Sequence, residues 1–219
     1  SSAASDVYKR QKQYDVIVVS DEIHCDLTKP GTEYIPFASV DDTCRDISVT
    51  CIAPTKTFNL AGLQTAAVYA ENSILHHRMW RQLNTDEVAE PNAFAIQATI
   101  AAFQYGEEWL DELREYVEKN KQYVTEFLQE KIPLIHPVAG DATYLMWLDC
   151  RKITESGRQF VKFIRKTSGL YVSGGNQYGR GGEGFLRVNV ATSKLVVEDG
   201  MQRLYESVDA WLKEEKISK

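Results

Sequence analysis

The chain contains two apolar runs, Val16-Ile-Val-Val-Ser20 and Ile47-Ser-Val-Thr-Cys-Ile52, and each leads into a residue that can carry chemistry. Asp21 follows the first run directly, and Lys56 follows the second after Ala-Pro-Thr. The continuous apolar run before Asp21 is typical of a parallel strand that is covered on both faces. Ligands of open α/β sheets bind beyond the carboxyl ends of the strands, so we expect Asp21 and Lys56 to converge on one crevice.

Length and composition favour a globular protein that acts on small molecules. The 219 residues, of which 43% are hydrophobic, suffice for one large domain or two small ones. The formal net charge is −6, and the basic residues are scattered among acids, which argues against a nucleic-acid or membrane-surface partner. The four cysteines lack C-x-x-C spacing, so we interpret them as mostly structural, reduced thiols of a cytoplasmic protein. No apolar run approaches the roughly 20 residues that span a bilayer.

The first eleven residues differ in character from the rest of the chain. The run Ser1-Ser-Ala-Ala-Ser-Asp-Val-Tyr-Lys-Arg-Gln11 has no amphipathic pattern and joins abruptly to a buried-strand sequence. It resembles a translated sequencing adapter. We therefore predict that residues 1–11 are a non-native leader and that the upstream part of the protein is missing.

Periodicity along the rest of the chain predicts an α/β fold. Apolar residues spaced by three, four and seven indicate one long amphipathic helix over residues 107–131. We predict a division between residues 12–106 and residues 107–219, with the long helix as the bridge. The expected strands cover residues 16–20, 47–52, 62–70, 143–149 and 185–190, and the expected further helices cover 74–83, 93–104, 157–167 and 195–215.

Four segments, in this order, resemble fold-type I pyridoxal 5'-phosphate (PLP) enzymes of the class I/II aminotransferase superfamily, and among them the cystathionine beta-lyase branch of the MalY/PatB type. They are Ser20-Asp-Glu-Ile-His-Cys-Asp-Leu27, Ala53-Pro-Thr-Lys-Thr-Phe-Asn-Leu-Ala-Gly-Leu63, Asn84-Thr-Asp-Glu-Val-Ala-Glu-Pro-Asn92 and Gly184-Phe-Leu-Arg-Val-Asn189. The resemblance implies the C-terminal part of the PLP-dependent transferase fold. Residues 12–106 would then complete a large PLP-binding domain, and residues 107–219 would form the small α/β domain.

The resemblance implies that Lys56 binds PLP as a Schiff base and, once released, takes the Cα proton of the substrate. It implies that Asp21 pairs with the protonated pyridine nitrogen, so that the ring can accept electrons. Considered alone, Lys56 is more often a surface lysine, and Asp21 is as often a turn acid at the end of a strand. The two residues together favour the cofactor site.

The resemblance adds one more cofactor residue and one substrate residue. His24 stands where related aminotransferases commonly carry a tyrosine that donates to the phenolic oxygen of PLP. A histidine satisfied by the backbone is the alternative. Arg187 would bind the α-carboxylate of the substrate through a bidentate ion pair, whereas an exposed arginine on an edge strand is its alternative.

The chain departs from the aminotransferase pattern at two positions. Gln64 stands where many of those enzymes place a phosphate-binding arginine, and Ala53 occupies a position that is often serine. The family draws its phosphate-binding loop and its ring-stacking aromatic residue from the upstream part. We therefore expect this chain alone to bind PLP poorly and to be nearly inactive.

Two other patterns do not indicate a site. The glycines of Gly179-Arg-Gly-Gly-Glu-Gly184 fit G-x-G-x-x-G but precede a strand, so we expect a mobile loop rather than a dinucleotide site. His76 and His77 are adjacent on an expected helix, and no histidine or cysteine spacing indicates zinc, so we predict no metal site.

The resemblance implies a carbon–sulfur beta-lyase that acts on cystathionine, cysteine or an S-substituted cysteine. Lys56 would take the Cα proton, and the returning electrons would expel the thiolate, with pyruvate and ammonia as the other products. An aminotransferase is the first alternative, because the same residues serve both reactions. A non-catalytic regulatory binding module is the second. For the complete protein we expect a homodimer.

Overall fold

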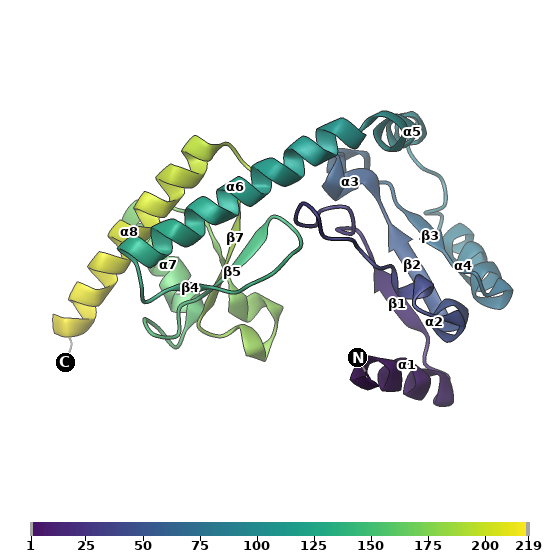
Figure 1. Cartoon of the computed structure of the whole chain (residues 1–219), viewed down its shortest axis with the longest axis horizontal. Helices are drawn as coiled ribbons and strands as arrows, with labels where there is room; N and C mark the ends of the chain where they lie inside the picture. The colour runs from purple at the N-terminus through teal and green to yellow at the C-terminus, as the bar shows by residue number, and fades with distance from the viewer. Residues whose placement is uncertain (1, 218–219) are drawn as a thin grey trace. The chain divides into compact units, whose positions relative to one another are not determined.

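The computed structural model describes residues 2–217 (Figure 1). The chain divides into two compact units, which we call the first unit, up to Glu112, and the second unit, from Leu113 onward. Helix α6 (Glu107–Lys131) has the bounds predicted from its periodicity and contains the boundary between the units. The domain division between residues 106 and 107 stays a prediction.

The first unit contains a sheet of three strands, β1 (Val18–Asp21), β2 (Ser48–Ile52) and β3 (Ala67–Tyr69), in the order β1-β2-β3. β1 and β2 run parallel, and Asp21 lies opposite Cys51. β3 pairs antiparallel with β2 on its other side. The first three residues of β2 are buried, as expected for a central strand.

The burial predicted for the first apolar run is wrong for the chain as described. Val19 is 66% exposed, and Val16 and Ile17 are exposed as well and lie before the strand begins. β1 stands at one edge of the sheet, and the burial of its residues alternates. Among residues 2–217, therefore, only the parallel pairing of this strand is confirmed, and one of its faces is uncovered.

The first unit also contains short and long helices. The α-helices of the first unit are α1 (Ser2–Gln13), α2 (Asp42–Ile47), α3 (Pro54–Thr57), α4 (Ser73–Thr85) and α5 (Ala95–Tyr105), and the 3-10 turns are η1 (Phe37–Ser39) and η2 (Ala61–Leu63). The side chain of Asn72 accepts hydrogen bonds from the first amides of α4, which fixes where that helix begins. α1 covers most of the predicted leader, and the non-native origin of residues 1–11 stays a prediction.

The second unit is an antiparallel sheet packed against helices. Its strands are β4 (His136–Pro137), β5 (Leu145–Asp149), β6 (Ser173–Gly174) and β7 (Phe185–Asn189), in the order β4-β5-β7-β6. Its helices are α6, α7 (Gly157–Ser168) and α8 (Lys194–Ile217), with 3-10 turns η3 (Gly175–Tyr178) and η4 (Arg180–Gly182) between β6 and β7.

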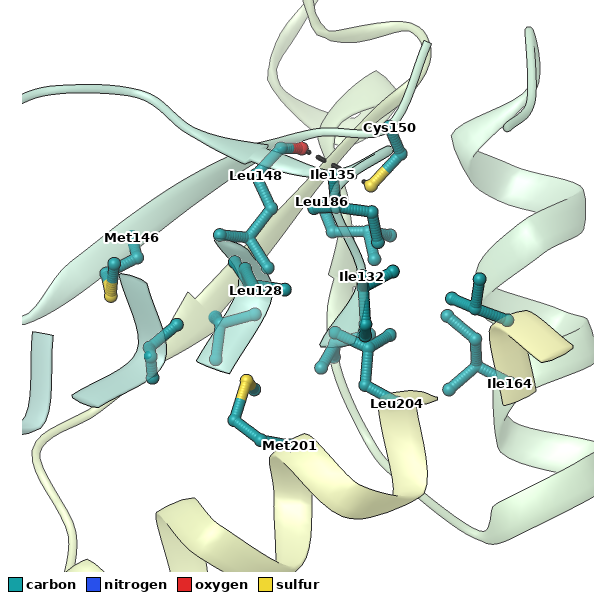
Figure 2. Packing of buried hydrophobic residues seen from close by; sticks show 14 of the residues in the cluster. Leu128, Ile132, Ile135, Met146, Leu148, Cys150, Ile164, Leu186, Met201 and Leu204 are labelled. Atoms are coloured by element: carbon teal, nitrogen blue, oxygen red, sulfur yellow. Dashed lines mark hydrogen bonds between the residues drawn. The ribbon is translucent and has the colours of Figure 1, made fainter. Parts of the chain in front are cut away.

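One face of this sheet forms the hydrophobic core. Leu148 of β5 and Leu186 of β7 are fully buried, and they belong to the same cluster as Leu128 of α6 and Leu204 of α8 (Figure 2). Burial alternates along both strands, so Phe185, Arg187 and Trp147 are only partly buried and lie on the opposite face.

A buried amide connects α6 to the end of β7. Asn120 is 2% exposed, and its side-chain nitrogen donates to the carbonyl oxygens of Val190 at 2.9 Å and Thr192 at 3.0 Å. Both carbonyls belong to the segment that leaves β7, so the side chain satisfies backbone groups that no strand partner reaches. This contact holds the helix against the end of the strand.

Most predicted elements are present with ends shifted by a few residues. The strand expected over residues 62–70 is the weakest of these predictions, because η2 occupies its start and Gln64 has a left-handed backbone with φ of 48°. The elements that were not predicted are α1, α2, α3, β4, β6 and the 3-10 turns. None of the helices within residues 2–217 is both long and apolar enough to span a bilayer.

Replacing Leu204 with alanine should lower the free energy of unfolding by about 3 kcal/mol, because the side chain is fully buried in the core. Urea unfolding followed by circular dichroism measures the change. Leu195→Ala in the same helix is the control, since Leu195 is 77% exposed and its loss should cost under about 0.5 kcal/mol. Equal losses for the two variants would contradict the placement of α8.

Candidate active site

Asp21 and Lys56 lie beyond two paired parallel strands. β1 ends at Asp21, which is opposite Cys51, and β2 ends one residue later at Ile52. Because the strands are parallel, the segments that follow them leave the sheet on the same side, at the carboxyl ends of the strands (Figure 1). Lys56 lies in the one-turn helix α3 that begins two residues after β2. The structure thus brings the predicted acid and the predicted lysine to one edge of one sheet.

Lys56 is the one exposed side chain of α3. Pro54, Thr55 and Thr57 are all buried, so three of the four residues of the turn pack into the protein. Proline at the first helical position suits the start of the turn, which closes with a hydrogen bond from the Phe58 amide to the Pro54 carbonyl. Among the described side chains, none forms a hydrogen bond or an ion pair with the Lys56 amine. The amine is therefore available to a ligand.

An aromatic side chain fastens the end of α3. The ring of Phe58 lies 5.5 Å from that of Phe103 in α5 and 5.8 Å from that of Trp109 in α6, measured between ring centroids. A Cβ atom on Gly106 would stand 2.5 Å from the Phe58 ring, so this position requires glycine. The segment that follows Lys56 is therefore packed between α5 and the start of α6.

Asp21 is followed by a turn. Asp21 is exposed, and its carboxylate accepts a hydrogen bond from the Ile23 amide at 3.3 Å. His24 lies half-buried in the same turn, and its carbonyl accepts from the Leu27 amide at 3.0 Å. Asp21, His24 and Lys56 thus belong to two adjoining segments of the first unit. Their roles toward a cofactor stay predictions.

A buried carboxylate anchors the loop that follows Asp21. Glu22 is 5% exposed, and its Oε1 accepts from the Ser20 hydroxyl at 2.9 Å and from the Phe37 amide at 3.0 Å. Its own amide donates to the Cys51 carbonyl at 2.9 Å, which extends the pairing of β1 with β2. Burial, followed by the charge of Glu22, raises the pKa of Tyr34 to about 12. Glu22 therefore holds both ends of this loop.

Arg187 belongs to the second unit and lies on a central strand. It stands opposite Trp147 of β5 on one side and Ser173 of β6 on the other, so it is not the edge-strand arginine of the alternative interpretation. Its guanidinium lies 4.3 Å from the centroid of the Tyr178 ring, which is 5.5 Å from that of Trp147. The ring covers one face of the guanidinium. Among the described carboxylates, none forms an ion pair with Arg187, so its N–H groups are available to an anion.

The glycine-rich loop before β7 packs on itself instead of standing free. A Cβ atom on Gly182 would lie 2.0 Å from the Gly175 carbonyl oxygen, and one on Gly175 would lie 2.7 Å from the Trp147 ring. The two turns η3 and η4 therefore touch through backbone atoms, which only glycine permits. The loop borders a cavity of about 300 Å³ lined by Val138, Trp147, Tyr178, Gly181, Gly182 and Phe185. The mobility expected for this loop stays a prediction.

The chemistry of the other candidate groups is limited. Burial raises the pKa of the Cys150 thiol to about 12 and that of the Cys25 thiol to about 11, which disfavours the reactive thiolate in both. Within residues 2–217, no group of three or more histidine, cysteine, aspartate or glutamate side chains is arranged to hold a metal ion.

Residues 3–204 match the family model described as "Aminotransferase class I and II". The chain belongs to this family. It is 40% identical over 192 residues to "Cystathionine beta-lyase PatB" of Bacillus subtilis, covering 88% of this chain and 50% of that protein. It is 30% identical over 200 residues to "Protein MalY" of Escherichia coli, covering 91% and 50%. The resemblance to the cystathionine beta-lyase branch is thereby confirmed.

Solved structures show the same relationship. The chain is 31% identical to the "PLP-bound C-S lyase from Staphylococcus hominis", with a TM-score of 0.81 over 92% of this chain and 52% of that one. It is 27% identical to cystalysin from Treponema denticola, with a TM-score of 0.90 over 94% and 52%. The predicted α/β class and the PLP-dependent transferase fold are confirmed. The chain spans about half the length of the curated relatives it matches.

The sequence did not predict several residues that lie beside the candidate site residues. Neither Tyr178 nor Trp147 was predicted as a site residue, yet both lie against Arg187. Thr57 and Asp26, which hydrogen-bond to each other, were also missed. The one available signal was their position, since Thr57 is adjacent to Lys56 and Asp26 follows His24 by two residues.

Alkylation of Cys25 by iodoacetamide should be slow at pH 8. With its pKa raised to about 11, roughly one thiol in a thousand is ionised at that pH, whereas a thiol at the ordinary pKa of 9.0 is ionised to about one part in ten. The rate, followed by mass spectrometry of the Cys25 peptide, should rise about tenfold per pH unit between pH 8 and 10. Free cysteine is the control, and equal rates at pH 8 would contradict the burial of this thiol.

Proposed function

We propose that this chain is part of a PLP-dependent carbon–sulfur beta-lyase that releases a thiol, pyruvate and ammonia from cystathionine, cysteine or another S-substituted cysteine. The observation that carries the proposal is the placement of Asp21 and Lys56 beyond the carboxyl ends of two paired parallel strands. The family membership and the names of its relatives, among them cystathionine beta-lyases and C-S lyases, support the same activity.

The residues at this edge fit PLP. Lys56 offers an exposed amine on a packed turn, which suits covalent attachment of an aldehyde. Asp21 offers an exposed carboxylate, which suits the protonated pyridine nitrogen. His24 supplies a ring that can donate a hydrogen bond to the phenolic oxygen. When bound, PLP supplies an electron sink for the Cα of an amino acid.

Each protein residue then has a defined task. The neutral amine of Lys56 takes the Cα proton, and it acts as a base only while it is unprotonated. The carboxylate of Asp21 favours the charged form of the pyridine nitrogen. Arg187 binds the α-carboxylate through its N–H groups, while the Tyr178 ring covers one face of its guanidinium.

An aminotransferase is the second candidate, because the family contains both activities. The chain is 23% identical over 202 residues to the aspartate aminotransferase of Bacillus subtilis. In that reaction the proton would return to the cofactor, and no thiol would leave. Gln64, in the place of the arginine typical of those enzymes, favours the lyase.

We further propose that the complete protein is a cytoplasmic homodimer. Large apolar side chains stand exposed on α5 and beside it, among them Phe94 at 76% and Tyr105 at 81%, and a partner surface would cover them. All four cysteines are free, as is usual in a reducing compartment. We propose no nucleic-acid or membrane partner.

Product analysis of the complete protein tests the activity. With PLP and L-cystathionine but no keto acid, it should form pyruvate and a free thiol, and Lys56→Ala should lower the rate at least about a thousandfold, because the base is lost. Lys119→Ala, at an exposed position of α6, is the control and should match the wild type. Amino transfer only in the presence of a keto acid would identify an aminotransferase, and full activity of Lys56→Ala would exclude both reactions by this mechanism. Neither activity in the wild type would favour a binding role.

Arg187→Lys in the complete protein should raise KM for the sulfur amino acid about 10- to 100-fold with a smaller change in kcat. Lysine keeps the charge but loses the bidentate geometry that matches a carboxylate. Steady-state kinetics measure the effect, and Arg180→Lys, in the turn η4, is the control. An unchanged KM would mean that Arg187 does not bind the substrate carboxylate.

A further inference from the structure

A hydrogen bond joins the two segments that carry Asp21 and Lys56. The hydroxyl of Thr57 donates to Oδ2 of Asp26 at 3.0 Å. Thr57 directly follows Lys56, and Asp26 lies in the loop that follows β1, two residues after His24. Thr57 is fully buried, so its hydroxyl has no access to water and depends on this acceptor.

α3 is too short to maintain its own geometry. It has four residues, and no side chain caps its first turn at Ala53. A single helical turn gains too few hydrogen bonds to offset the entropy of ordering it. Its conformation therefore depends on contacts with the rest of the first unit. The Phe58 ring supplies one such contact on the α5 side, and the hydroxyl of Thr57 supplies another on the side of the β1 loop.

The loop between β1 and η1, which contains Asp26, is itself held in place by hydrogen bonds. Glu22 fixes its two ends through the Ser20 hydroxyl and the Phe37 amide. Asp26 is half-buried within the loop, and its charge contributes to the raised pKa of the neighbouring Cys25 thiol, after burial. Thr57 thus donates to a charged acceptor, and such hydrogen bonds are stronger than those between neutral groups.

We propose that Asp26 and Thr57 are positioning residues that hold Lys56 in register with Asp21 and His24. Neither side chain touches the reacting atoms. Their hydrogen bond fixes the position of α3, which carries Lys56, relative to the loop that follows Asp21. It thereby orients the lysine amine toward the cofactor. The proposal rests on the proposed function, because it assigns Lys56 to covalent attachment of PLP.

Threonine suits this position for two reasons. Its hydroxyl reaches Asp26, and its methyl group fills a site from which water is excluded. Thr57→Val keeps the shape but removes the hydroxyl that donates to Asp26, and Thr57→Ser keeps that donor but removes the methyl group. A purely structural role would make both variants less stable without separating their effects on Lys56.

The first unit offers a matched control. Thr50 of β2 is also a buried threonine, and within the described residues its hydroxyl has no hydrogen-bond partner. Thr50→Val therefore makes the same chemical change in the same unit without breaking a hydrogen bond. Any general effect of placing valine in this interior should be seen in both variants.

The test uses the complete protein and measures three quantities: the Kd for PLP, the fraction of chains carrying pyridoxyl-Lys56 after borohydride reduction, and the Tm of the cofactor-free protein. Thr57→Val should raise the Kd about tenfold, as expected for losing a hydrogen bond to a charged group, and should lower the trapped fraction at equal occupancy. Thr57→Ser and Thr50→Val should stay within about twofold of the wild type.

Asp26→Asn changes the other partner of this hydrogen bond and tests it independently if Thr57→Val does not fold. It retains an acceptor oxygen without the charge, so the Kd should rise about threefold, and alkylation of Cys25 should become faster because a negative charge beside the thiol is lost. Wild-type attachment of PLP to Lys56 in both Thr57→Val and Asp26→Asn would overturn the positioning role alone. Absence of pyridoxyl-Lys56 from the wild type would overturn the proposed function, and the positioning role with it.

Discussion

The parallel pairing of β1 with β2 is the constraint on which the candidate site depends. Because both strands point the same way, the segments that carry Asp21 and Lys56 leave the sheet at one edge. An antiparallel pair would send them to opposite edges. β3 runs antiparallel to β2, so it begins at the end of the sheet where β2 finishes, and it contributes no candidate residue there. The central position of β2 buries its first residues and gives the turn of Lys56 a fixed base.

In the second unit, the two faces of β7 have different roles, because successive side chains of a strand point to opposite faces. Along β7, Leu186 and Val188 enter the core, whereas Phe185 and Arg187 lie on the other face. A cation would be costly in the core, so the alternation keeps Arg187 away from it. The glycine-rich loop then closes over this second face and brings Tyr178 against the guanidinium. Core and candidate anion site therefore share one strand without conflict.

In the segments that follow β1 and β2, different residues fix the backbone and offer side chains to a ligand. The buried Glu22 and Thr57 and the partly buried Phe58 fix the backbone. Asp21 and Lys56, by contrast, are exposed. The relatives of this chain include both a cystathionine beta-lyase and an aspartate aminotransferase, so one scaffold of this kind can serve more than one reaction.

Local periodicity was sufficient to find the long helix over residues 107–131, the parallel strands before Asp21 and Lys56, and the strand of Arg187, because each follows from the spacing of nearby apolar residues. It could not find the uncovered face of β1, the closed glycine loop or the hydrogen bond between Thr57 and Asp26. Each of these depends on residues that are far apart in the sequence, 31 positions in the case of that hydrogen bond. Periodicity reports which face of an element is apolar, but it does not report which distant group will meet that face. Packing in three dimensions decides that.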